Sequence, residues 1–192
     1  LTGMEFPFDA LAGEAARKSQ AKRWSEWCDA LRDGVVPREV LSLIQSQDKE
    51  VQLRGVRALG SLGGTGASEA IIHLIAPFRS LDYRKVQTPD KDIVMAGLRS
   101  LGRLREPEGL PALIGFLDTI GWARYAADAL GKFGSVKAVA HLVANYPRFA
   151  KDLNRRLAKD FPDDDEARLG WNPEDRMYET PYAIMLALSR LS

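Results

Sequence analysis

One stretch of this sequence occurs three times, and that repetition limits the possible folds more than any other feature. The segment DKEVQLRGVRALGSL, which starts at Asp48, returns 42 positions on as DKDIVMAGLRSLGRL, so that Val51 aligns with Ile93. A third copy, WARYAADALGKF, begins at Trp122, which lies 29 positions after Ile93. Sequences that repeat with a period of roughly 20–50 residues fold into rows of similar units. We therefore expect a stack of repeats.

Each copy has the apolar spacing of an α-helix, followed by a glycine- or proline-bearing turn and a second apolar stretch. A pair of helices cannot bury its apolar side alone, so successive pairs must stack around one continuous core. The sequence thus predicts an all-α fold. The matching apolar positions are Leu59, Leu101 and Leu130 in the first helices, and Ile71, Leu113 and Leu142, each followed by Ile72, Ile114 or Val143, in the second helices.

A small residue also recurs at one position of the first helices, as Gly55, Gly97 and Ala126. Glycine within a helix costs about 1 kcal/mol relative to alanine. Two glycines at the same position therefore predict that another element approaches the backbone closely there.

The order of these residues resembles that of HEAT-like repeats, in the short variety named after phycobilin lyases. The resemblance extends from Asp48 to about Pro147. It implies a right-handed α-α superhelix and says little about function. The family usually places arginine after the opening aliphatic residue, where this chain has Gln52, Val94 and Ala123. We expect the hydrogen bonds of that arginine to be absent or rebuilt.

The repeats suggest one domain with helical ends. Three repeats are expected at 48–75, 90–117 and 119–146, with an insertion at 76–89. Residues 1–47 are expected to form an N-terminal helical cap. Residues 148–192 are expected to form a C-terminal helical cap that contains a long loop at 162–181.

Within these caps, four helices are expected, one of which begins near Pro37 and carries Val40, Leu41 and Ile44. Another runs from Phe8 to Arg32 with Trp24 and Trp27 in the capping core, one covers 149–161, and one closes the chain at 182–191.

Charge and composition set few limits on the partner. Lysine and arginine (27) nearly balance aspartate and glutamate (26), which leaves a net charge of +1 and no overall attraction to nucleic acid. No apolar run approaches the ~20 residues of a membrane span. The chain begins at Leu1 without a visible secretory signal. We expect a processed or excised piece; the compartment stays open, with the cytoplasm slightly favoured, and so does the oligomeric state.

No set of residues has the spacing of a catalytic or metal site. His73 and His141 fall at different positions of different second helices, and Cys28, the only cysteine, is expected to be a buried apolar residue. The acidic run at 163–166 lacks the order of a calcium loop. The basic residues at 17–23 read as a solvated helix surface. We expect no enzyme activity, no metal and no cofactor.

The predicted function is a scaffold that binds a protein or peptide. Second helices usually line the concave side of such stacks, and their positions outside the apolar stripe are small or nearly uncharged, which suits a peptide or helix better than phosphates. Two residues of the long loop, Trp171 and Tyr178, are also predicted to contact the partner. The alternatives are a chromophore-lyase-like subunit or chaperone, and a nucleic-acid-binding HEAT-like protein. The predicted groove positions are Glu69, His73, Pro111, Gly115, Ala140 and Ala144.

Overall fold

The computed structural model describes residues 11–119, 121–160 and 180–192, and the regular elements within these ranges are helical. The predicted all-α fold is confirmed. No helix in the described ranges has both the length and the apolar character needed to cross a lipid bilayer. The α-helices are α1 (Glu14–Arg32), α2 (Arg38–Ile44), α3 (Lys49–Leu62), α4 (Ala67–Ile75), α5 (Thr88–Leu104), α6 (Gly109–Leu117), α7 (Ala123–Phe133), α8 (Val139–Asp160) and α11 (Thr180–Leu191).

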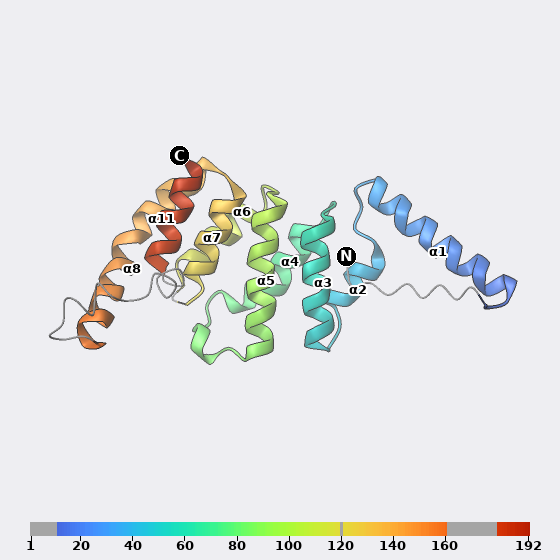
Figure 1. The fold of residues 1–192 in the computed structure, drawn as a ribbon, viewed down its shortest axis with the longest axis horizontal. Helices are drawn as coiled ribbons and strands as arrows, with labels where there is room; N and C mark the ends of the chain where they lie inside the picture. Colours follow the sequence, from blue (N-terminus) through green and yellow to red (C-terminus); the bar gives the residue numbers. More distant parts are fainter. Residues whose placement is uncertain (1–10, 120, 161–179) are drawn as a thin grey trace.

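The helices form two layers. The first helices α3, α5 and α7 contact one another in order, and α11 contacts α7 as a further first helix would. The second helices α4, α6 and α8 contact their neighbours in the same order and lie against the first layer (Figure 1). The chain thus alternates between layers, and the core lies between them.

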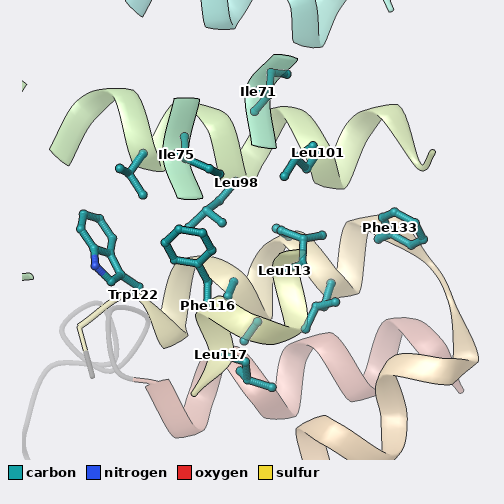
Figure 2. Close-up of a cluster of buried hydrophobic side chains, with 14 of the residues drawn as sticks. Ile71, Ile75, Leu98, Leu101, Leu113, Phe116, Leu117, Trp122 and Phe133 are labelled. Carbon is teal, nitrogen blue, oxygen red and sulfur yellow. The ribbon is translucent and has the colours of Figure 1, made fainter. Parts of the chain in front are cut away.

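The buried core follows the repeat register. Leu59, Leu101 and Leu130 are fully buried at equivalent points of the first helices. Figure 2 shows Ile71, Leu101, Leu113 and neighbouring side chains converging from α4, α5 and α6. These predicted core positions are confirmed. The residue that follows in each second helix was predicted to be apolar core as well. That prediction is wrong for Val143, which is 54% exposed.

Neighbouring first helices are close because one position in each is glycine. A Cβ atom added at Gly60 would lie 2.4 Å from Cβ of Ser100 in α5. One added at Gly102 would lie 2.7 Å from the carbonyl oxygen of Ala129 in α7, and one at Gly131 would lie 2.8 Å from Cα of Ala187 in α11. No real Cβ fits at such distances without a shift of the helices.

A second glycine position serves the contact with the preceding second helix. A Cβ at Gly55 would lie 2.8 Å from Cβ of Leu43, at the end of α2. At Gly97 it would lie 2.8 Å from Cγ2 of Ile75 in α4, and Ala126 is fully buried. The predicted close approach at this position is confirmed.

Where the family usually has arginine, Gln52 makes a contact between units. Its amide donates a hydrogen bond of 3.1 Å to the carbonyl oxygen of Ile44, and its side-chain oxygen accepts one of 3.1 Å from Lys49. Val94 and Ala123 are buried and apolar at the same position. The hydrogen bonding is therefore rebuilt at the first repeat, and burial replaces it at the next two.

Asp128 joins α7 to α11. Its carboxylate lies 2.9 Å from the Arg190 guanidinium and 2.7 Å from the Lys132 ammonium. Burial alone would raise the pKa of Asp128, but the hydrogen bonds from Lys132 and Arg190 outweigh it and lower the pKa below its usual value.

The two ends differ from expectation in three details. α8 continues through Pro147 as one helix up to Asp160, rather than ending before a separate helix at 149–161. Proline has no backbone N–H and cannot donate the usual helical hydrogen bond, but Phe149 beyond it is buried in the core and holds the helix in line. α1 begins at Glu14 and buries none of its residues, so the Trp24–Trp27 pair lies outside the described core. Cys28, expected to be buried, is exposed.

The core register can be tested at Leu101. Replacing Leu101 with alanine leaves a cavity between the layers and should lower the free energy of unfolding by about 2–5 kcal/mol. Urea denaturation measures this loss. The matched control, Leu81→Ala, truncates a side chain that is 46% exposed and should cost less than about 1 kcal/mol. Equal losses in the two variants would contradict the register.

The link between α7 and α11 should depend on pH. Because the pKa of Asp128 is lower in the folded chain than in the unfolded one, its contribution is present above about pH 4 and is lost as the pH falls through the folded pKa. Asp128→Asn should therefore lower stability at pH 7 by about 1 kcal/mol or less, since the pair is partly exposed, and by less at pH 3. A loss that is the same at both pH values would exclude the carboxylate as its cause. Glu108→Gln, at an exposed position, serves as the control.

Candidate functional site

The six residues predicted to bind a partner lie on three neighbouring second helices and point away from the core. Their inward neighbours Ile71, Leu113 and Leu142 are fully buried. α4 contacts α6, and α6 contacts α8, so the six positions share one side of the stack. We call this set the second-helix face: Glu69, His73, Pro111, Ala140 and Ala144, which are exposed, and Gly115, which is half-buried.

The insertion adds a charge to this face that the repeat pattern did not predict. A Cβ atom at Gly115 would lie 2.9 Å from Nη1 and 3.0 Å from Cδ of Arg79. The Arg79 side chain therefore lies across α6 at Gly115. The middle of the second-helix face is covered by an arginine rather than open.

Other candidates do not assemble into a site. His73 and His141 are exposed on α4 and α8. Across the described ranges, no group of three or more histidine, cysteine, aspartate or glutamate side chains could hold a metal ion. On α1, Lys18 and Lys22 pair with Glu14 and Glu26 along an exposed surface. The loop residues Trp171 and Tyr178, and the acidic run at 163–166, lie outside the described residues.

A hollow lies on the other layer, between α3 and α5. Its volume is about 320 Å³. Two of its residues come from α3 and five from α5, and they combine three guanidinium groups with one carboxylate and a small apolar patch. We call it the arginine hollow, and it is lined by Arg57, Ser61, Asp92, Met95, Ala96, Arg99 and Arg103.

The arginines of this hollow have no partner within the described part of the chain. Among residues 11–119, 121–160 and 180–192, neither a hydrogen bond nor an ion pair involves the guanidinium of Arg57, Arg99 or Arg103. Two other arginines are paired with carboxylates: Arg190 contacts Asp128 at 2.9 Å, and Arg84 contacts Asp82 at 3.0 Å. The hollow therefore has uncompensated positive charge.

The repeat register places these arginines together. Arg57 and Arg99 occupy the same position of the first and second copies, so the packing of α3 on α5 brings them to adjacent points of the layer. Arg103 follows Arg99 by one helical turn. All three lie outside the apolar stripe of the first helices, so the register alone places them outward. The hollow depends on the spacing of the two helices, which the sequence pattern did not give.

Comparison with known protein families supports the fold. Residues 122–146, which cover α7 and the start of α8, match the PBS lyase HEAT-like repeat. This chain contains a HEAT-like repeat. A comparison with curated proteins found no match.

The insertion at 76–89 packs against the HEAT-like repeat that matches the family model. The Trp122 indole donates a hydrogen bond of 3.2 Å to the carbonyl oxygen of Leu81, and the Tyr83 ring packs edge-on against it at 4.9 Å. Thr119 donates a hydrogen bond of 2.6 Å to the carbonyl oxygen of Arg79. Burial, together with the neighbouring Tyr125, raises the pKa of Tyr83. These contacts hold the insertion in place and thereby fix the position of Arg79 on the second-helix face.

Proposed function

We propose that this chain is a non-catalytic scaffold that binds a protein partner through its second-helix face. The observation that carries the proposal is the exposure of small, uncharged residues on two successive second helices, α6 and α8. Pro111, Ala140 and Ala144 are exposed, whereas the residues beside them fill the core.

The chemistry of this face suits a protein better than a nucleic acid. Its six positions contain no lysine or arginine, whereas phosphate backbones are bound mainly by such residues. Small side chains allow a helix or an extended peptide to approach closely, and the centres of protein interfaces are poor in charged residues. Arg79 at Gly115 provides one polar anchor on an otherwise nearly neutral face.

The test places charge on this face without touching the core. In Ala140→Glu/Ala144→Glu, two exposed positions of α8 gain carboxylates, one turn apart. The desolvation of these carboxylates should reduce capture of a partner from the host's own lysate by about tenfold or more. Quantitative mass spectrometry of the retained proteins measures the loss. Like charges one turn apart cost only a few tenths of a kcal/mol in a helix, so the thermal unfolding midpoint should change little.

A control variant carries the same charge change elsewhere. Gln45→Glu/Gln47→Glu alters two exposed positions between α2 and α3. It should retain the same proteins as the wild type. If both variants lose the same proteins equally, or if neither loses any, the second-helix face is not the binding surface.

A further inference from the structure

We infer that the arginine hollow between α3 and α5 is a second binding site, which takes an acidic segment of a protein partner. This site lies on the layer of first helices and is distinct from the second-helix face. The inference rests on the charge, the shape and the polarity of the hollow.

The positive charge of the hollow favours a ligand that carries carboxylates. Three guanidinium groups and one carboxylate line the hollow, and Arg57, Arg99 and Arg103 have no partner in the described structure. Arginine is suited to carboxylates because its planar fork donates two parallel hydrogen bonds. A ligand that supplies carboxylates would compensate charges that the fold itself leaves uncompensated.

Shape points to a short peptide segment. The volume of about 320 Å³ has room for a few side chains. Met95 and Ala96 line it with apolar surface between the charged residues, and the thioether of methionine adapts to varied apolar groups. An acidic segment with an interspersed leucine could place its carboxylates on the arginines and its apolar side chain on Met95.

The two ends of the hollow also differ in charge. Asp92 and Arg103 are separated on α5 by 11 positions, or about 16 Å along the helix axis. Asp92 would repel a carboxylate at its own end, so the carboxylates of the ligand should gather near Arg99 and Arg103. This asymmetry gives the bound segment a preferred direction.

Nucleic acid fits the hollow less well. Binding of a phosphate backbone draws on many cations in a row, but two lysines of this layer are already paired with carboxylates. Lys132 on α7 is neutralised by Asp128, and Lys49 on α3 by Asp90 at 3.0 Å. The hollow gathers three arginines at one point, which suits a short acidic segment better than a long phosphate backbone.

Fluorescence anisotropy with the full chain tests the proposal. The probes are a fluorescein-labelled Glu-Glu-Leu-Glu-Glu-Leu peptide, its Gln-Gln-Leu-Gln-Gln-Leu counterpart, and a labelled 12-nucleotide oligothymidylate. The glutamate peptide should bind, and the glutamine peptide should not. Arg99→Gln/Arg103→Gln should weaken binding by about tenfold or more, because two charge-assisted hydrogen-bonding partners are lost. Asp92→Asn should strengthen binding, because it removes a repulsive carboxylate.

The control removes two arginines outside the hollow. Arg38→Gln/Arg54→Gln changes two exposed residues and alters the net charge equally, and it should weaken binding less than about twofold. Circular dichroism should show the wild-type helical signal for every variant. Equal weakening by both double variants would mean that overall charge attracts the peptide, and the proposal would fail. It would also fail if the glutamate peptide does not bind, or if the oligothymidylate binds more tightly and depends on the same two arginines.

Discussion

The spacing between neighbouring first helices determines the rest of this structure. Gly60, Gly102 and Gly131 each lie against the backbone or the Cβ of the next first helix, at distances that leave no room for a side chain. Helices that approach so closely exclude water along their full contact and bring the fully buried leucines of successive repeats into one core. The core, the layers and both surfaces follow from this spacing.

The two surfaces of the stack differ because each repeat exposes different residues on its two helices. The second helices expose small and nearly uncharged side chains, with Arg79 added by the insertion. The first helices expose arginines at a repeated position, and the contact of α3 with α5 places Arg57 and Arg99 in one hollow. We propose that each surface binds a protein segment of its own chemistry, one nearly neutral and one acidic.

Much of the fold could be predicted because its determinants are local and repeated. The period located Leu59, Leu101 and Leu130 in the core, and Gly55 and Gly97 at close contacts. The features that the sequence did not reveal depend on contacts between distant segments. Arg79 lies at Gly115 in an insertion that Tyr83 and Leu81 hold on Trp122 and that Thr119 holds at the Arg79 carbonyl. The arginine hollow likewise depends on the distance between α3 and α5. The spacing of residues within one helix does not determine that distance.

The need for glycine where the first helices meet can be tested by the sign of one stability change. Alanine favours an isolated helix over glycine by about 1 kcal/mol. Gly115→Ala, where the added Cβ meets only the flexible end of Arg79, should gain part of that stability in urea denaturation. Gly102→Ala, where the Cβ meets the Ala129 backbone at 2.7 Å, should be less stable than the wild type in spite of the same preference. A Gly102→Ala protein as stable as the wild type, or more so, would contradict the account.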